Sequence, residues 1–260
     1  MSAIALSGRD LSIKFADRAV LNAVDIDIHC GEVTALLGPN GAGKSTLLRL
    51  LNGEISSMSD IRYFDVPRQQ WPTRLLAQHL AMLPQHSTLS FPFLAREVVE
   101  LGAIPLKLTQ KATRTLADKY MRLTDVWHLA ERLYPSLSGG EKQRLHLARV
   151  LVQLEQSANK KILMLDEPTS ALDLSHQQNT LKIARELATE SNAAVIIVLH
   201  DLNLAAQYAD RMVILHNGKI ACDAPPQQAL TKNMLKHVYN YDAIVTTHPT
   251  LGFPQILPDN

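Results

Sequence analysis

The sequence has few cysteines, no long apolar run and no excess of one charge. Its 260 residues include only Cys30 and Cys222, too few for a disulfide framework and suited to a reducing cytosol. No apolar stretch approaches the roughly 18 residues that a membrane helix needs, and we expect no secretory signal in MSAIALSGRD, which lacks a basic region and an apolar core. With a net charge of +1, the electrostatic footprint of a nucleic-acid binder is missing, so we expect no nucleic-acid partner.

The order of apolar patterns predicts an α/β fold with a mostly parallel core sheet, a small antiparallel N-terminal sheet and a helical insertion. Alternating or continuous apolar residues predict strands, the main ones at 11–15, 24–28, 32–38, 60–66, 161–166, 193–200 and 211–220. Helices are expected at about 43–53, 138–154 and 175–188, and a helical block with breaks at Gly102 and Pro105 is expected from 94 to about 132.

The stretch GPNGAGKS has the spacing G-x-x-x-x-G-K-S, follows an apolar strand and opens a predicted helix. Its glycines let successive backbone N–H groups turn toward the phosphates of a nucleotide, and the helix dipole adds positive potential. Lys44 would reach the phosphates, and the Ser45 hydroxyl would ligate Mg²⁺. The alternative is a glycine-rich turn between a strand and a helix. The predicted nucleotide-binding residues here are Gly38, Pro39, Asn40, Gly41, Ala42, Gly43, Lys44, Ser45 and Thr46.

Two adjacent carboxylates, Asp166 and Glu167, follow the apolar strand KILML. In an open parallel sheet this carboxyl edge is where ligands lie. Neighbouring residues on a strand point to opposite sides, so the two side chains would have different tasks. Asp166 is predicted to hold Mg²⁺ and Glu167 to polarise the water that attacks the γ-phosphate. Taken alone, Glu167 could also be a surface acid at a strand end.

The stretch LSGGEKQR places Ser138, Gly139 and Gly140 at the start of a predicted helix, as a second anion site or a simple helix cap. Together with the phosphate loop, the two carboxylates and a histidine after the next strand, it resembles the ATP-binding subunits of ABC transporters over nearly the whole chain. In that family, residues 137–141 correspond to the signature motif, which contacts ATP held by the other subunit. The family usually has glutamine where this chain has Glu141, and we expect a modest effect at most.

The resemblance implies further site residues, ATP and Mg²⁺ as cofactors, and catalytic roles for Lys44, Glu167 and His200. Gln85 corresponds to the glutamine that touches Mg²⁺ and moves with the membrane subunit, and His200 to the histidine that contacts the γ-phosphate. Residues 170–173 correspond to the loop that crosses the dimer interface. Phe15 lies where the family places an aromatic residue that stacks on adenine. On periodicity alone, Phe15 could also be a core residue.

The resemblance also implies the partners and the location. The family mechanism is ATP-driven closure of a homodimer, hydrolysis and reopening, coupled to two copies of an integral membrane permease. The subunit would lie at the cytoplasmic face of the inner membrane, held there through the permease, and a periplasmic ligand-binding protein would act with it indirectly.

Three stretches, at 82–102, 165–177 and 200–220, resemble the family members that drive import of iron chelates and cobalamin, those for haem above all. Ferric siderophores and cobalamin are the alternative cargoes. Soluble relatives that act on ribosomes or DNA fit less well, because this chain has one cassette and only about 50 residues between Gln85 and Ser138, without sustained heptads. Its ten histidines are scattered, so we expect no haem or metal cluster among them.

The expected domain organisation is an ATPase domain at 1–240, with a helical subdomain at about 87–155, and a short C-terminal extension at 241–260. One departure from the family lies between Ile55 and Arg74, where the usual glycine-containing hairpin is replaced. This change leaves the local structure open but lies away from the predicted phosphate site. The pair His248-Pro249 is expected to form a turn.

Overall fold

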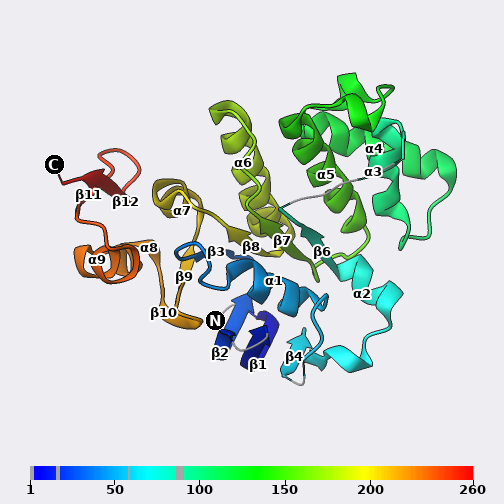
Figure 1. Ribbon diagram of the computed structural model, residues 1–260. Coiled ribbons are helices and arrows are strands. Elements are labelled where there is room, and N and C mark those ends of the chain that lie inside the picture. Colours follow the sequence, from blue (N-terminus) through cyan, green and yellow to red (C-terminus); the bar gives the residue numbers. More distant parts are fainter. Residues whose placement is uncertain (1–2, 16–17, 58, 86–88, 90, 260) are drawn as a thin grey trace.

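A six-stranded sheet forms the centre of the molecule in the computed structural model, which describes residues 3–15, 18–57, 59–85, 89 and 91–259 (Figure 1). From one edge to the other its strands are β10 (Lys219–Ala224), β9 (Arg211–His216), β3 (Val33–Leu37), β8 (Ala194–Val198), β7 (Ile162–Asp166) and β6 (Leu80–Leu83). All neighbours pair in parallel except β9 and β10. The predicted mostly parallel core sheet is confirmed.

A second, antiparallel sheet is formed by β2 (Arg18–His29), β1 (Ile4–Phe15), β4 (Asp60–Tyr63) and β5 (Val66–Pro67), in that order. The single strand expected at 60–66 is wrong, because β4 and β5 form a hairpin. Its two turn residues, Phe64 and Asp65, have φ values of 51° and 65°. Such turns usually contain asparagine or glycine, and Phe64-Asp65 has neither, so no residue pattern indicates this turn. The Phe64 ring packs near Trp71 and His79, which helps to hold the turn.

Helices cover both faces of the central sheet, as Figure 1 shows. Between the two sheets lies α1 (Lys44–Asn52), which ends at Gly53 in the left-handed conformation, as predicted. The other helices are α2 (Thr73–His79), α3 (Ala95–Glu100), α4 (Gln110–Leu123), α5 (Gly139–Gln153), α6 (Leu174–Ser191), α7 (Leu202–Tyr208), α8 (Pro226–Ala229) and α9 (Lys232–Tyr239). Short 3₁₀ turns lie at Arg68–Gln70, Leu101–Ala103, Trp127–Leu129 and Tyr134–Ser136.

The apolar core has two parts, one on each face of the central sheet, because side chains alternate along each strand. In β7, Ile162 and Met164 belong to the part that contains α1, whereas Leu163 and Leu165 belong to the part that contains α5 and α6. By the same alternation Asp166 faces α1. This strand therefore ends with the Asp166 carboxylate beside the start of α1, and Glu167 follows it outside the strand.

Within the helical block between β6 and β7, the turn after α3 packs tightly on α5. A Cβ atom added at Gly102 would lie 2.1 Å from the Arg149 backbone oxygen, so only glycine allows this close approach of the turn after α3. The predicted bounds of the helical subdomain, 87–155, stay a prediction, and residues 86–88 and 90 are outside the described part of the chain. Among the described residues, none of the helices combines the length and apolar character required to cross a membrane.

The C-terminal residues form a hairpin of β11 (Ala243–Thr247) and β12 (Pro254–Pro258). It is joined to α7 by Asn203, whose Nδ2 donates to the Ile256 oxygen at 3.2 Å and whose Oδ1 accepts from the Ile256 nitrogen at 2.8 Å. Ile256 and Ala243 are buried in the main core. His248 lies at the turn of this hairpin, where its Nδ1 accepts from two backbone N–H groups. The predicted extension is thus a docked hairpin, and its boundary at 240/241 stays a prediction.

Candidate functional site

The phosphate loop joins β3 to α1 in a conformation that requires its glycines. Gly38 has a φ of 139°, and a Cβ atom there would lie 2.2 Å from the Leu215 oxygen. Gly43 has a φ of 105°, and a Cβ atom there would lie 2.9 Å from the Val20 oxygen. Side chains at these positions would therefore be strained and would collide with backbone. The loop curls tightly, with the Ala42 nitrogen donating to the Pro39 oxygen at 3.1 Å.

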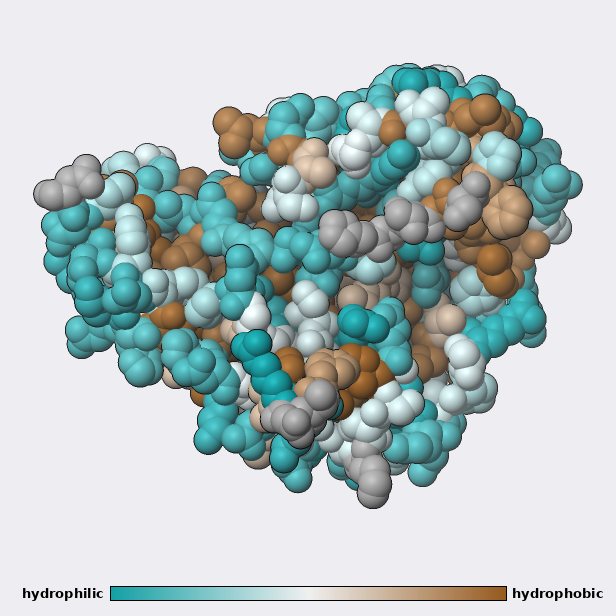
Figure 2. All heavy atoms as spheres, viewed as in Figure 1, coloured by the Kyte–Doolittle hydropathy of each residue, from teal (hydrophilic) through white to brown (hydrophobic). Residues whose placement is uncertain are grey.

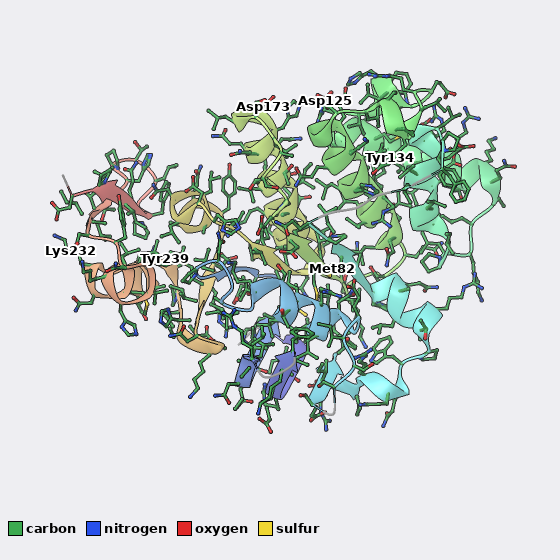
Figure 3. The ribbon with its side chains drawn as sticks, viewed as in Figure 1. Met82, Asp125, Tyr134, Asp173, Lys232 and Tyr239 are labelled. Carbon is green, nitrogen blue, oxygen red and sulfur yellow. The ribbon has the colours of Figure 1, made fainter. Side chains whose placement is uncertain are left out.

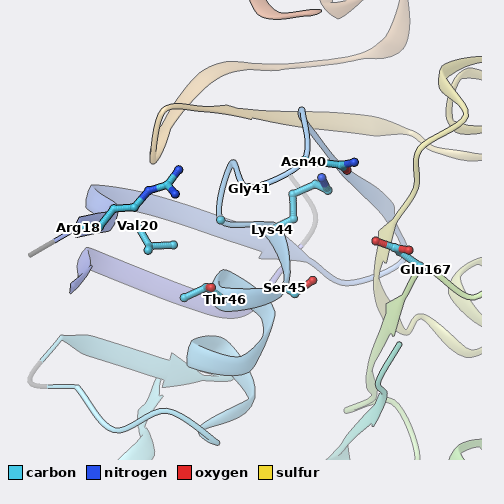
Figure 4. Close-up of a pocket in the computed structure, with 9 residues that line it drawn as sticks. Arg18, Val20, Asn40, Gly41, Lys44, Ser45, Thr46 and Glu167 are labelled. Atoms are coloured by element: carbon cyan, nitrogen blue, oxygen red, sulfur yellow. The ribbon is translucent and has the colours of Figure 1, made fainter. Parts of the chain in front are cut away.

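A cavity of about 300 Å³ lies over this loop (Figure 4). Its lining includes seven residues predicted from the sequence: Asn40, Gly41, Gly43, Lys44, Ser45, Thr46 and Glu167. Two further lining residues, Arg18 and Val20, were missed. They lie at the start of β2, and no motif marks them. The only signal was their position shortly after Phe15, the residue predicted to stack on adenine.

Lys44 is buried at the start of α1, with 6% of its surface exposed. Its Nζ atom donates to the backbone oxygens of Gly38 at 2.8 Å and Pro39 at 3.1 Å. Burial lowers the pKa of the ammonium group, and the nearby carboxylates of Glu167 and Asp166 oppose that shift. The loop thus holds a cation at the point where phosphate charge would be bound.

Ser45 and Asp166 form the part of the site that suits a metal ion. The Ser45 Oγ atom donates to Asp166 Oδ1 at 3.2 Å. Burial raises the pKa of the Asp166 carboxyl, and the charge of Glu167 adds to that shift, while the Ser45 hydrogen bond and the charge of Lys44 oppose it. Hydroxyl and carboxylate oxygens are ligands that Mg²⁺ prefers, so the predicted pair of Ser45 and Asp166 fits this ion. The metal role predicted for Gln85 stays a prediction, because its side chain contacts Glu167.

Glu167 lies at the centre of a second group of side chains. Its Oε1 atom is 2.6 Å from His200 Nε2, and its Oε2 atom accepts from Gln85 Nε2 at 2.7 Å. Its backbone has a φ of 51° although the residue is not glycine, and the next residue is Pro168. Non-glycine residues in this region gather at functional sites. Three residues predicted separately from the sequence, Glu167, His200 and Gln85, are thus in direct contact.

Ser138, Gly139 and Gly140 do not line this cavity. Ser138 caps α5: its Oγ accepts from the Glu141 nitrogen at 3.3 Å, and its own nitrogen donates to Glu141 Oε2 at 2.7 Å. This reciprocal pair explains the carboxylate found in place of glutamine, since either residue completes such a capping box. The bond from the Ser138 nitrogen lowers the pKa of the Glu141 carboxyl. Within one chain, these signature residues lie apart from the phosphate loop.

Phe15 lies at the end of β1, where 52% of its surface is exposed, and it is not among the residues that line the cavity. Residues 16 and 17, which follow it in the turn to β2, lie outside the described residues. The prediction that it stacks on adenine stays a prediction. In the loop at 170–173, the Ser170 hydroxyl donates to the Glu167 oxygen at 3.1 Å, and Asp173 caps α6.

A phosphate loop ahead of a helix, a buried aspartate and glutamate at the sheet edge, and a capped helix carrying a Ser-Gly-Gly stretch define an ATPase of the ABC type. Residues 21–170 match the family model described as ABC transporter, and the chain belongs to that family. It is therefore an ATP-binding and ATP-hydrolysing subunit of a transporter. Membership implies a membrane permease as partner and dimerisation of the ATP-binding subunits.

Among its relatives is a hemin import ATP-binding protein, HmuV, of Vibrio parahaemolyticus serotype O3:K6, 68% identical over 98% of each chain. Among solved structures, a chain of an ABC transporter assigned to the metal-chelate type, in an inward-facing conformation, matches with a TM-score of 0.81, 24% identity and coverage of 99% and 98% of the two chains. An ATP-binding cassette in a dimeric, post-hydrolysis state with ADP and Pi matches with a TM-score of 0.74, 24% identity and coverage of 85% and 98%. These structures support the fold, and the predicted ABC ATPase fold is confirmed.

Proposed function

We propose that this chain binds Mg-ATP as a homodimer and that its hydrolysis drives the import of haem through a separate membrane permease. The observation that supports haem as the cargo is the 68% identity to a hemin import ATP-binding protein over 98% of both chains. That resemblance covers the nucleotide site and the segments on either side of it. Import of haem, two copies of the permease, a periplasmic haem-binding protein and a place at the cytoplasmic face of the inner membrane are all parts of this proposal.

In the proposed site, the phosphates lie over residues 38–46, with backbone N–H groups and Lys44 against their charge. Ser45, Asp166 and Gln85 would hold Mg²⁺, which when bound neutralises phosphate charge. Phe15 would lie beside the adenine. The signature residues Ser138–Gly140 of the second copy would close over the γ-phosphate.

Glu167 is proposed as the base that orients and polarises the attacking water, with His200 holding its carboxylate and contacting the γ-phosphate. Support comes from the two short contacts of this carboxylate, to His200 and to Gln85. Lys44 would stabilise the charge that develops on the transferred phosphate.

Transport in proteoliposomes tests the proposal. The chain is reconstituted with its cognate permease so that this subunit faces the vesicle lumen. The cognate binding protein is supplied outside the vesicles and ATP inside them. We expect ATP-dependent accumulation of haem. Accumulation of a ferric siderophore or cobalamin without haem would assign a different cargo. In a separate pull-down with this chain, recovery of ribosomes or DNA in place of a membrane protein would contradict the transport role.

A further inference from the structure

The side chain of Gln143 joins the signature helix α5 to the segment from Glu167 to Ala171. Its Nε2 atom donates to the Glu167 backbone oxygen at 2.9 Å, and its Oε1 atom accepts from the Ala171 nitrogen at 3.4 Å. One amide therefore bridges the two ends of the segment from Glu167 to Ala171. The same helix packs closely here, since a Cβ atom at Gly140 would lie 2.9 Å from the Ala171 oxygen.

The Gln143 side chain contacts a strained stretch of backbone at Glu167. Glu167 has a φ of 51° and precedes proline, and a non-glycine residue keeps this strained conformation only where the surrounding structure holds it. Its backbone oxygen accepts from the Ser170 nitrogen at 3.3 Å, the Ser170 hydroxyl at 3.1 Å and Gln143 at 2.9 Å. The first two come from the same turn. The Gln143 bond is the shortest of the three and comes from another element.

A second set of contacts, through Asp125, joins α5 to α6. His176 on α6 has its Nδ1 2.8 Å from Asp173 Oδ1 and its Nε2 3.3 Å from Asp125 Oδ2, and Arg144 on α5 also contacts Asp125. Asp125, in the turn after α4, and Asp173, at the start of α6, lie near one another in the upper part of Figure 3. The two carboxylates in this set are exposed, at 66% and 67%, and none of these contacts reaches Glu167.

We propose that Gln143 is a positioning residue for Glu167: it fixes the left-handed backbone that aims the carboxylate at the attacking water. This inference rests on the proposed function, which gives Glu167 the role of base. It extends that function by making the signature helix of each chain part of the support for the base of the same chain. Gln143 itself touches neither nucleotide nor metal in this scheme.

Two substitutions remove the hydrogen bond to the Glu167 oxygen while keeping most of the side-chain volume. Gln143→Met keeps length and removes both the donor and the acceptor. Gln143→Glu keeps the acceptor for the Ala171 nitrogen but places an oxygen against the Glu167 carbonyl. Displacing a catalytic group by about 1 Å can cost 10²-fold in rate, so we expect kcat to fall roughly 10- to 100-fold in both variants. The KM for ATP, and binding of a non-hydrolysable Mg-ATP analogue, should stay within about twofold because residues 38–46 are unchanged.

Gln153→Met is a matched control on the same helix. Gln153 also bridges two backbone groups, here by donating to the Ala77 oxygen at 2.8 Å and the Leu80 oxygen at 3.0 Å, and it has no hydrogen bond to the segment from Glu167 to Ala171. Its loss should lower the unfolding temperature as much as the loss of Gln143 does and leave kcat near the native value. A merely structural role for Gln143 would make the two methionine variants alike in both measurements.

A double-mutant cycle decides whether Gln143 acts through Glu167. In a Glu167→Gln chain, the added Gln143→Met should change the residual turnover by less than about twofold, because the base it positions is gone. An equal loss in both backgrounds, or a native kcat in the single Gln143 variants, would overturn the inference. If Gln143→Met does not fold, Gln143→Glu decides in the same way. Native turnover in Glu167→Gln alone would remove the proposed base as well, whereas loss there with native turnover in the Gln143 variants would remove this inference only.

Discussion

The Nε2 atom of His200 lies 2.6 Å from Oε1 of Glu167, although the two residues come from the ends of different strands. The pairing follows from sheet order: β8, which precedes His200, is the direct neighbour of β7, which precedes Glu167. The carboxyl ends of parallel neighbours meet at one edge, so the two side chains reach the same point. Gln85, after β6 on the other side of β7, completes the group from the opposite flank.

Glu167→Gln should abolish nearly all ATP turnover while leaving ATP binding intact. The amide keeps the size and most hydrogen bonds of the carboxylate but cannot act as a base. A positioned general base contributes about 10²–10⁴ in rate, or roughly 3–5 kcal/mol of barrier. Because Lys44, Ser45 and the second copy's signature residues are unchanged, the variant should accumulate as a closed dimer with Mg-ATP. The measurement is the ATPase rate together with size-exclusion profiles with and without Mg-ATP.

Lys44→Ala is the contrasting control, because it removes the buried cation under the phosphates. It should lose nucleotide binding, and its chains should stay apart in Mg-ATP. If Glu167→Gln retains more than about a tenth of native turnover, a smaller loss than removal of a base predicts, another residue activates the water.

Much of this site was predictable from the sequence because its residues lie at the ends of strongly apolar strands. The phosphate loop, Asp166 and Glu167 each follow a buried strand, and local patterns fix such strands well. The contact of Gln143 with Glu167 was not predictable, since it depends on how α5 packs against a loop 24 residues further along. The hairpin at Phe64 and Asp65 was missed because its first turn position, at a φ of 51°, is a phenylalanine and not the asparagine, aspartate or glycine usual there.

Phe91→Glu should lower transport without lowering ATP binding by the isolated subunit. Phe91 follows the Gln85 segment and is 70% exposed, an unusual state for a phenylalanine, with its ring 6.2 Å from that of Phe93. A loop that contacts the nucleotide site at one end and the permease at the other could transmit motion, which is why we predict that this surface faces the permease. Phe93 packs partly on the core, so its substitution would also disturb folding.

Leu251→Glu is the matched control for Phe91→Glu. Leu251 is similarly exposed, at 61%, but lies in the turn of the C-terminal hairpin, at the other end of the molecule in Figure 1. Hydrophilic side chains cover much of the face shown in Figure 2. Because Leu251 is exposed and belongs to neither part of the apolar core, an acid at this position should be tolerated. Haem uptake at the native rate by the Phe91 variant would place the docking surface elsewhere.

Glu141→Gln should change the KM for ATP by no more than about threefold, less than 1 kcal/mol. Its carboxylate is turned back to the Ser138 nitrogen and lies 3.7 Å from Arg132, so it does not point freely at a phosphate. Glutamine can make the same capping contact. Glu141→Ala, by contrast, should destabilise the protein by about 1 kcal/mol, because it leaves a helix N-terminus without half of its cap. Urea unfolding and steady-state kinetics measure the two effects, and a tenfold gain in ATP affinity for Glu141→Gln would contradict this explanation.

His146 should make the protein less stable as the pH falls from about 6.5 to 4. It is 3% exposed inside the helical block, with its Nε2 3.0 Å from the Tyr134 hydroxyl, and burial lowers its pKa to about 4. Over that range His146 binds a proton in the unfolded chain but not in the folded chain. The free energy of unfolding therefore decreases with falling pH. The limit for one such group is about 1.4 kcal/mol per pH unit.

His146→Phe tests this dependence, because phenylalanine fills a similar volume and cannot titrate. Urea unfolding at pH 7, 6 and 5 should show a steeper loss of stability for the native chain than for the variant, and the two curves should run parallel above pH 7, where the imidazole is neutral in both states. His128→Phe, at an exposed position of the same block, should keep the native slope. Equal slopes for the native and His146→Phe chains between pH 6.5 and 5 would show that His146 binds its proton in the folded state as well. The prediction that the buried imidazole stays neutral would then be wrong.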